Sequence, residues 1–226
     1  MATDLTLPRI DPYELPAPAD FPVSRVRWQL DPGRAAILVH DMQRYFLAPF
    51  RGGRIDELVA ELARLLADCR RAGIPVIYTA QPGVQSAQER GLLTDMWGEG
   101  IGAVIDRRPE LEQIVDDLAP EAGDVQLVKW RYSAFQRTEL ADVLADRGRD
   151  QLVITGVYAS IGCLATAVEA FMRDVQPFLV GDAVADFSRA DHDHALDYVA
   201  RRAGVVSSVA QVRSTVAATV PTGGSR

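Results

Sequence analysis

Short apolar segments alternate with longer amphipathic segments along most of this chain, and this alternation constrains the fold most strongly. The apolar segments are rich in branched residues and nearly continuous, as is typical of parallel strands buried on both faces. We predict six strands, at 35–39, 75–79, 125–129, 151–157, 177–180 and 204–207. We predict helices at 54–72, 110–118, 139–146, 165–174 and 191–203. The expected fold is α/β: a three-layer, Rossmann-like arrangement with a six-stranded parallel sheet flanked by helices.

Composition and charge narrow the classes of function. The chain has 226 residues and a formal net charge of −7, so it offers no basic stripe for nucleic acid and little attraction to an anionic membrane surface. With two cysteines, a disulfide framework is not expected, and no targeting or membrane-spanning segment is visible. We therefore expect a cytoplasmic protein with no nucleic-acid or membrane partner, while a small anionic substrate remains compatible with local positive residues.

The first predicted strand ends abruptly in a carboxylate, Asp41. Ligands of open α/β sheets bind outside the carboxyl ends of the strands, which places Asp41 where chemistry is usually done. Apolar and aromatic neighbours would desolvate the carboxyl group and raise its pKa, so that it can act as a general acid. The structural alternative is an aspartate that only caps the following helix or turn.

Other polar residues follow the next strands. Gln81, Lys129, Tyr158 and the Gly162–Cys163 pair come at or after the ends of the second, third and fourth predicted strands. Each has a structural interpretation: a turn glutamine, a solvated lysine or a core tyrosine. Because the carboxyl ends of parallel strands converge in space, the set favours a binding pocket.

Several motifs together resemble the isochorismatases, within the wider superfamily of isochorismatase-like hydrolases, from about residue 22 to about residue 208. They include Leu38-Val39-His40-Asp41-Met42-Gln43, Tyr78-Thr79-Ala80-Gln81-Pro82, Asp95-Met96-Trp97-Gly98, Lys129-Trp130-Arg131-Tyr132-Ser133-Ala134-Phe135, Gly156-Val157-Tyr158-Ala159 and Ala185-Asp186-Phe187-Ser188. We expect residues 31–220 to form an isochorismatase-like hydrolase domain, with residues 1–30 as an N-terminal extended arm and residues 221–226 as a disordered tail.

The resemblance implies a reaction and a catalytic pair. Such enzymes cleave the enolpyruvyl vinyl ether of isochorismate or of 2-amino-2-deoxyisochorismate to pyruvate and a dihydro-dihydroxybenzoate or dihydro-hydroxyanthranilate, in siderophore or phenazine pathways. By resemblance Asp41 is the general acid that protonates the vinyl methylene carbon, and Lys129 sits beside it. A nearby ammonium lowers the pKa of a carboxyl group, which opposes the acid role until an anionic substrate binds.

The resemblance also places substrate contacts. Its motifs put Phe46, Gln81, Arg90, Trp97, Tyr158 and Gly162 at substrate-binding positions, and it implies no cofactor. Arg90 is the candidate for a bidentate grip on a carboxylate, and a solvated loop arginine is the alternative.

Position 162 distinguishes this chain from related amidases. Nicotinamidase-like relatives place a nucleophilic cysteine there, whereas this chain has Gly162, with Cys163 one residue later. Cys163 is therefore expected to be a buried small hydrophobe. Ser160 replaces the histidine that usually follows Tyr-Ala in the family. A Cys-dependent amidase and a non-catalytic binding module remain the alternatives to an isochorismatase.

The histidines and the N-terminal arm complete the sequence-based predictions. His192 and His194 alternate with aspartates and share no helix face, which indicates a charged helix start and no metal site. His40 directly precedes Asp41, so strand alternation points it to the opposite face. The arm contains Tyr13, Phe21 and Trp28, and it is expected to pack on its own or a neighbouring subunit, within a homo-oligomer that is most simply a dimer.

Overall fold

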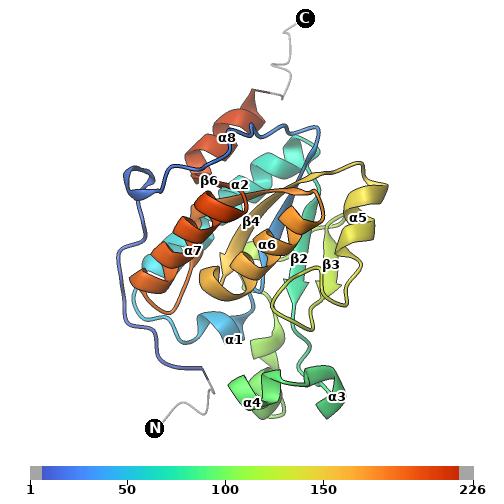
Figure 1. The fold of residues 1–226 in the computed structure, drawn as a ribbon. Coiled ribbons are helices and arrows are strands. Elements are labelled where there is room, and N and C mark those ends of the chain that lie inside the picture. The colour runs from blue at the N-terminus through green and yellow to red at the C-terminus, as the bar shows by residue number, and fades with distance from the viewer. Residues whose placement is uncertain (1–6, 219–226) are drawn as a thin grey trace, which may run out of the picture.

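The computed structural model describes residues 7–218, and a single parallel sheet lies at its centre (Figure 1). The strand order is β3-β2-β1-β4-β5-β6, and every neighbouring pair is parallel. The strands are β1 Ala35–His40, β2 Val76–Ala80, β3 Val125–Val128, β4 Gln151–Val157, β5 Gln176–Ala185 and β6 Val205–Ser207. The predicted six-stranded parallel sheet is confirmed.

Helices cover both faces of the sheet. Helices α2 (Arg54–Arg71) and α8 (Val209–Ala217) contact each other and β5 on one side. Helices α5 (Leu140–Asp146), α6 (Leu164–Met172) and α7 (Arg189–Arg202) lie on the other side, as Figure 1 shows. Each face has its own cluster of buried apolar side chains, so the three-layer prediction is also confirmed.

Burial explains why these segments adopt their structures. Every residue of β1 is buried, as expected for a central strand covered on both faces. Helix α2 buries Leu58, Leu62 and Leu65 along one stripe, and Gly73, with φ 71°, follows its end in the left-handed region that glycine adopts without strain.

The predicted helix at 110–118 is wrong. This region forms two short 3₁₀ turns, η3 (Pro109–Glu112) and η4 (Asp116–Leu118), which bury only Leu111 and Leu118. The segment lacks the continuous apolar stripe that stabilises a longer helix by packing.

Other differences concern local elements. The strand predicted at 177–180 extends to Ala185, because the β4–β5 register shifts between Ile154 and Gly156 and pairing then resumes. Several short elements and α8 were not predicted from the sequence: η1 Pro18–Asp20, α1 Arg44–Leu47, α3 Ala87–Arg90, α4 Leu93–Trp97, η2 Gly100–Ala103 and η5 Ala159–Cys163. Most of them lie near the carboxyl ends of the strands, where α1, α3 and α4 are seen in Figure 1.

The N-terminal arm packs on its own chain. Ile10 is buried and forms a bridge with Phe50, the amide of Arg25 donates to the carbonyl of Ala200, and the ring of Phe21 lies over Gly181. This confirms packing on the same subunit, while assembly into an oligomer stays a prediction. The predicted tail at 221–226 lies outside the described residues. Among residues 7–218, the longest apolar helix falls short of what a membrane span requires.

Candidate active site

A pocket opens at the carboxyl ends of the central strands. It is lined by all the residues that the sequence predicts for the site: Asp41, Phe46, Gln81, Arg90, Trp97, Lys129, Tyr158 and Gly162. These side chains come from elements up to 121 positions apart, since parallel strands bring their carboxyl ends to one edge. The predicted convergence is therefore observed, although the role of each residue stays a prediction.

Asp41 ends β1 in an unusual backbone conformation. Its φ is 51°, in the left-handed region that non-glycine residues seldom adopt. The Asp41 amide donates to the carbonyl oxygen of Thr79 at 3.2 Å, and the Thr79 hydroxyl donates to Asp41 Oδ1 at 2.7 Å. Pairing between β1 and β2 thus continues into the site and fixes the carboxylate.

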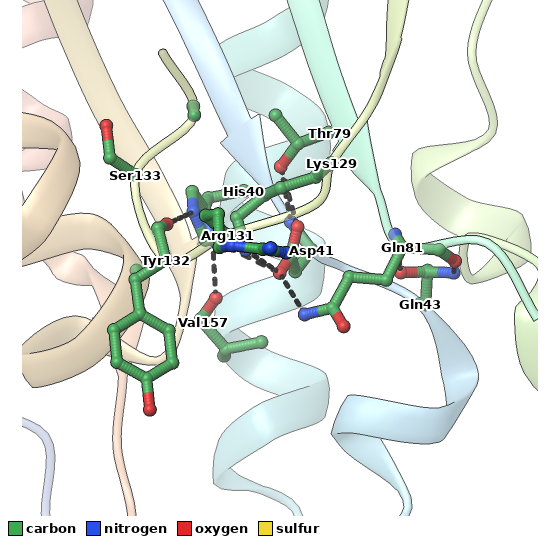
Figure 2. Close-up of polar contacts among 12 residues, drawn as sticks. His40, Asp41, Gln43, Thr79, Gln81, Lys129, Arg131, Tyr132, Ser133 and Val157 are labelled. Atoms are coloured by element: carbon green, nitrogen blue, oxygen red, sulfur yellow. Dashed lines mark hydrogen bonds and ion pairs between the residues drawn. The ribbon is translucent and has the colours of Figure 1, made fainter. Parts of the chain in front are cut away.

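Two more donors hold the other carboxylate oxygen, as Figure 2 shows. Lys129 Nζ donates to Asp41 Oδ2 at 2.8 Å, and Gln81 Nε2 donates to it at 3.3 Å. Asp41 and Lys129 are only 3% and 2% exposed. The side-chain amide of Gln43 holds the backbone of Gln81: Gln43 Oε1 accepts from the Gln81 backbone N–H at 2.8 Å, and Gln43 Nε2 donates to the Gln81 backbone carbonyl at 2.8 Å.

The predicted rise in the pKa of Asp41 is wrong. Burial does raise the pKa of this carboxyl, but the charge of Lys129 and the hydrogen bonds from Lys129 and Thr79 outweigh burial. The net effect lowers the pKa below its usual value, so Asp41 is a carboxylate at neutral pH. The proposed helix-capping role is also absent, since Gln43 and not Asp41 stands at the start of α1.

The prediction that His40 points away from Asp41 is wrong. His40 lines the same pocket, and its Nδ1 lies 3.8 Å from Asp41 Oδ2. Strand alternation fails here because Asp41 has left the extended conformation. The imidazole is buried, with Nδ1 at 2.8 Å from the carbonyl oxygen of Val157. Burial lowers the pKa of His40, so the ring is neutral and Nδ1 carries the hydrogen that faces this carbonyl.

Arg90 is buried at the end of α3. Its guanidinium donates to the carbonyl of Gly98 and, at 3.4 Å, to the side-chain oxygen of Gln85. Both acceptors are uncharged, so they leave the positive charge of Arg90 available to an anionic ligand. The alternative of a solvated loop arginine is excluded by its 7% exposure.

Aromatic rings form one wall of the pocket. Tyr158 and Phe187 stack with centroids 4.2 Å apart, and Trp97 also stacks on Phe187, at 6.0 Å. The Tyr158 hydroxyl donates to the carbonyl of Phe46 at 2.7 Å, and Trp97 Nε1 donates to the Tyr132 hydroxyl at 2.7 Å. The polar ends of these rings are thus engaged by the protein, and the stacked rings give the pocket an apolar wall.

Gly162 and Cys163 lie in the π-helical turn η5, which joins β4 to α6. Cys163 is fully buried, and burial raises the pKa of its thiol well above the usual value. Its prediction as a buried small hydrophobe is confirmed. The backbone amide of Ser160 donates to the Asp186 carboxylate, which anchors the turn, and the Ser160 side chain does not line the pocket.

His192 lies inside α7, away from the pocket, and both of its ring nitrogens have partners. Nε2 is 2.9 Å from the carbonyl oxygen of Gly181, and Nδ1 is 3.1 Å from the Tyr13 hydroxyl. The helix-start interpretation of the Asp/His cluster is confirmed, since Ser188 caps α7 and accepts from the Asp191 amide. Across the described part of the chain, no three potential metal ligands gather.

The sequence reasoning missed several residues of the pocket, including Leu7, Leu93, Tyr132, Ile161 and Phe187. Leu7 lies outside the quoted motifs, and only tertiary structure reveals its place, whereas Phe187 stands in the motif Ala185-Asp186-Phe187-Ser188 and was not assigned to the site. Thr79, Gln43 and His40 were visible in the motifs, and their polar character within apolar segments was a signal that the site needs them.

A family model described as the isochorismatase domain matches residues 35–211. This chain belongs to the isochorismatase family. The "Isochorismatase" of Bacillus subtilis (strain 168) is 51% identical over 200 residues, which cover 88% of this chain and 63% of that protein. The match therefore spans less than two thirds of that longer member of the isochorismatase family.

Two further relatives differ in length and in name. The "Phenazine biosynthesis protein PhzD" of Pseudomonas fluorescens is 47% identical over 206 residues, covering 91% of this isochorismatase-family chain and 98% of that protein. A crystal structure of a cysteine hydrolase from Pseudomonas syringae pv. phaseolicola 1448A superposes with a TM-score of 0.76 at 26% identity, over 88% of this chain and 98% of that one. The fold is thus shared by proteins whose names imply different chemistry.

Proposed function

We propose that this protein hydrolyses the enolpyruvyl vinyl ether of isochorismate or of 2-amino-2-deoxyisochorismate. The products are pyruvate and a dihydro-dihydroxybenzoate or dihydro-hydroxyanthranilate. The observation that carries the proposal is the buried Asp41–Lys129 pair, with a 2.8 Å hydrogen bond, at the base of a pocket that also holds Arg90. The two curated relatives support the substrate class, one by its name and the other by its pathway.

The pocket matches the charge and shape of such a substrate. Lys129 and Arg90 contribute two positive charges against the single negative charge of Asp41, which suits a ligand with two carboxylates. The apolar wall formed by Tyr158, Phe187 and Trp97 suits its unsaturated ring. Net negative charge over the whole chain does not oppose binding, because local charges dominate at contact distance.

Asp41 is the proposed general acid. It delivers a proton to the methylene carbon of the vinyl ether, and the electron pair of the double bond forms the new C–H bond. The resulting oxocarbenium ion is stabilised by the carboxylate left behind. Water then adds to the cationic carbon, and the hemiketal collapses to pyruvate while the ring keeps its oxygen.

Because the pKa of Asp41 is lowered, Asp41 can act as an acid only if substrate binding itself causes the carboxylate to take up a proton. Lys129 and Thr79 favour the ionised form of Asp41. When a dianionic substrate enters, its carboxylates share the donors of Lys129 and add negative potential beside Asp41, and both effects raise the pKa of Asp41. The acid form is then present next to the alkene that it must protonate.

The amidase alternative finds no support in the thiols. Cys163 is fully buried with a raised pKa, whereas a nucleophilic cysteine needs an accessible thiolate. Cys69 is also buried, inside α2, and burial raises the pKa of its thiol to about 12.

The test is pyruvate release from both substrates, measured side by side with coupled detection. We expect turnover of at least one substrate, and we expect Cys163→Ala and thiol alkylation to leave most of that turnover intact. Failure to release pyruvate from either substrate would refute the proposal and favour a non-catalytic module. Turnover that disappears in a folded Cys163→Ala variant would instead favour a cysteine-dependent hydrolase.

A further inference from the structure

Position 162 has no room for any side chain. An ideal Cβ added to Gly162 would lie 2.0 Å from His40 Cε1 and 2.6 Å from His40 Nε2. The backbone of Gly162 is not in the left-handed region, since its φ lies outside the range that disfavours other residues. Glycine is therefore required at this position by the imidazole of His40 and not by backbone strain.

The imidazole cannot easily move aside. His40 is 1% exposed, and its ring lies between two carbonyl groups (Figure 2). Nδ1 is 2.8 Å from the Val157 oxygen, and Nε2 is 3.3 Å from the Tyr132 oxygen. Any rotation of the ring that makes room at position 162 would break the hydrogen bond to Val157 and leave buried polar groups unpaired.

The same ring borders the reacting carboxylate. Its Nδ1 lies 3.8 Å from Asp41 Oδ2, the oxygen that also accepts from Lys129. The two carbonyl groups that it contacts belong to residues that line the pocket. The ring of His40 thus borders the acid and lies against the backbone of Tyr132, the residue whose hydroxyl accepts from Trp97.

We propose that His40 is a positioning residue for Asp41, and that His40 and Gly162 form a mutually exclusive pair. With histidine at position 40, no side chain fits at position 162, and the pocket is committed to chemistry that uses no protein nucleophile there. With a small residue at position 40, a side chain at position 162 becomes possible. The catalytic half of this inference rests on the proposed function, while the steric half does not.

Asparagine is the informative replacement for His40. Its amide NH₂ group can take the place of the Nδ1–H donor that faces the Val157 carbonyl, whereas it has no atoms equivalent to Cε1 and Nε2, which crowd position 162. Leucine has a similar branched shape but no donor. A comparison of His40→Asn with His40→Leu therefore separates the effect of the hydrogen bond to Val157 from the effect of side-chain volume at position 40.

The steric half is tested by thermal unfolding of four proteins: the unchanged protein, Gly162→Ala, His40→Asn and the double variant. We expect Gly162→Ala alone to lower Tm by roughly 5–10 °C, as overpacking of a core does. In the His40→Asn background, Gly162→Ala should lower Tm by less than about 2 °C. Gly53→Ala is the matched control, because a Cβ there meets nothing within 4 Å and the backbone φ of −76° is ordinary. An equal loss of Tm in both backgrounds would overturn the mutual exclusion.

The positioning half is tested by steady-state kinetics of His40→Asn and His40→Leu, each checked for fold by its Tm. We expect His40→Leu to lower kcat about tenfold or more with KM within about threefold, because misplacement of the acid affects the chemical step. His40→Asn should recover most of kcat. Equal kcat values for the two variants would overturn the positioning role. If the unchanged protein hydrolyses neither substrate while the Tm coupling is present, the proposed function fails and the steric pair stands.

Discussion

Lys129 Nζ and Asp41 Oδ2 are joined by a hydrogen bond of 2.8 Å, in which both charged groups are almost completely withdrawn from water. A buried pair of this kind is costly to break, since removal of one charge leaves the other uncompensated. It also lowers the pKa of Asp41 and so favours the ionised carboxylate. Catalysis by Asp41 as an acid must therefore begin with a change in this pair.

Substrate binding should consequently take up a proton at neutral pH. An unreactive analogue with a saturated side chain and both carboxylates would show this in calorimetric titrations at pH 7 in buffers of different ionisation enthalpy. We expect an uptake approaching one proton per site. Asp41→Asn is the control, and it should take up none. Binding of the analogue without proton uptake would show that ligand binding does not protonate Asp41.

Replacing the acid should abolish the chemical step and spare binding. Asp41→Asn keeps the shape of the side chain and removes the transferable proton, so we expect kcat to fall on the order of a hundredfold or more. The dissociation constant of the saturated analogue should change much less than kcat. Near-full turnover in this variant would eliminate Asp41 as the acid.

The strands and the position of the site follow from local patterns in the sequence. Continuous apolar segments such as 35–39 and 151–157 have few alternatives to a buried parallel strand, and their ends predict where Asp41 and Tyr158 lie. The helix prediction at 54–72 matches α2 to within one residue, because its apolar stripe is long and regular.

The remaining features depend on tertiary contacts. The left-handed backbone at Asp41, beside its contacts with Thr79, places the carboxylate on the same side as His40 against the alternation rule. The lowered pKa of Asp41 depends on Lys129, 88 positions away, and on the hydroxyl of Thr79. The Tyr13 hydroxyl accepts a hydrogen bond from the backbone amide of Asp186, 173 positions away in the sequence, and no local sequence pattern predicts such a contact.

The Tyr13 hydroxyl also contacts His192, and this buried histidine predicts that the stability of the protein depends on pH. The Gly181 carbonyl can only accept, so His192 Nε2 carries the hydrogen, and the neutral Nδ1 accepts from the Tyr13 hydroxyl. Burial lowers the pKa of His192 to about 4. In the unfolded chain, His192 is protonated at a higher pH than in the folded protein. The stability that neutral, buried His192 contributes is therefore complete above about pH 6.5 and is lost as the pH falls toward 4.

The size of this effect is roughly 3 kcal/mol between the two limits, from the conversion of a pKa shift into free energy. Urea unfolding at pH 7 and at pH 4.5 measures it. In His192→Gln, which does not titrate, the decrease in the free energy of unfolding over this range should be clearly smaller. An equal decrease in both proteins would assign the acid sensitivity to other groups.

Assembly is a separate prediction. The arm covers its own subunit, while Val23, Leu92 and Met96 remain largely exposed. Burial of large apolar side chains at an interface stabilises it by roughly 1.5–3 kcal/mol each, so we expect a homo-oligomer, most simply a dimer. Light scattering at micromolar concentration decides the question, since a mass near the 24.7 kDa of one chain would refute it.

Hydrolysis in H₂¹⁸O tests the central claim most directly, because it reports which C–O bond breaks. Protonation of the vinyl carbon followed by capture of water cleaves the bond between the ring oxygen and the pyruvyl carbon. Mass spectrometry of the ring product formed from isochorismate should therefore show no ¹⁸O at its hydroxyl groups, with pyruvate as the co-product. Incorporation of ¹⁸O into the ring product would contradict the vinyl ether mechanism and the role assigned to Asp41.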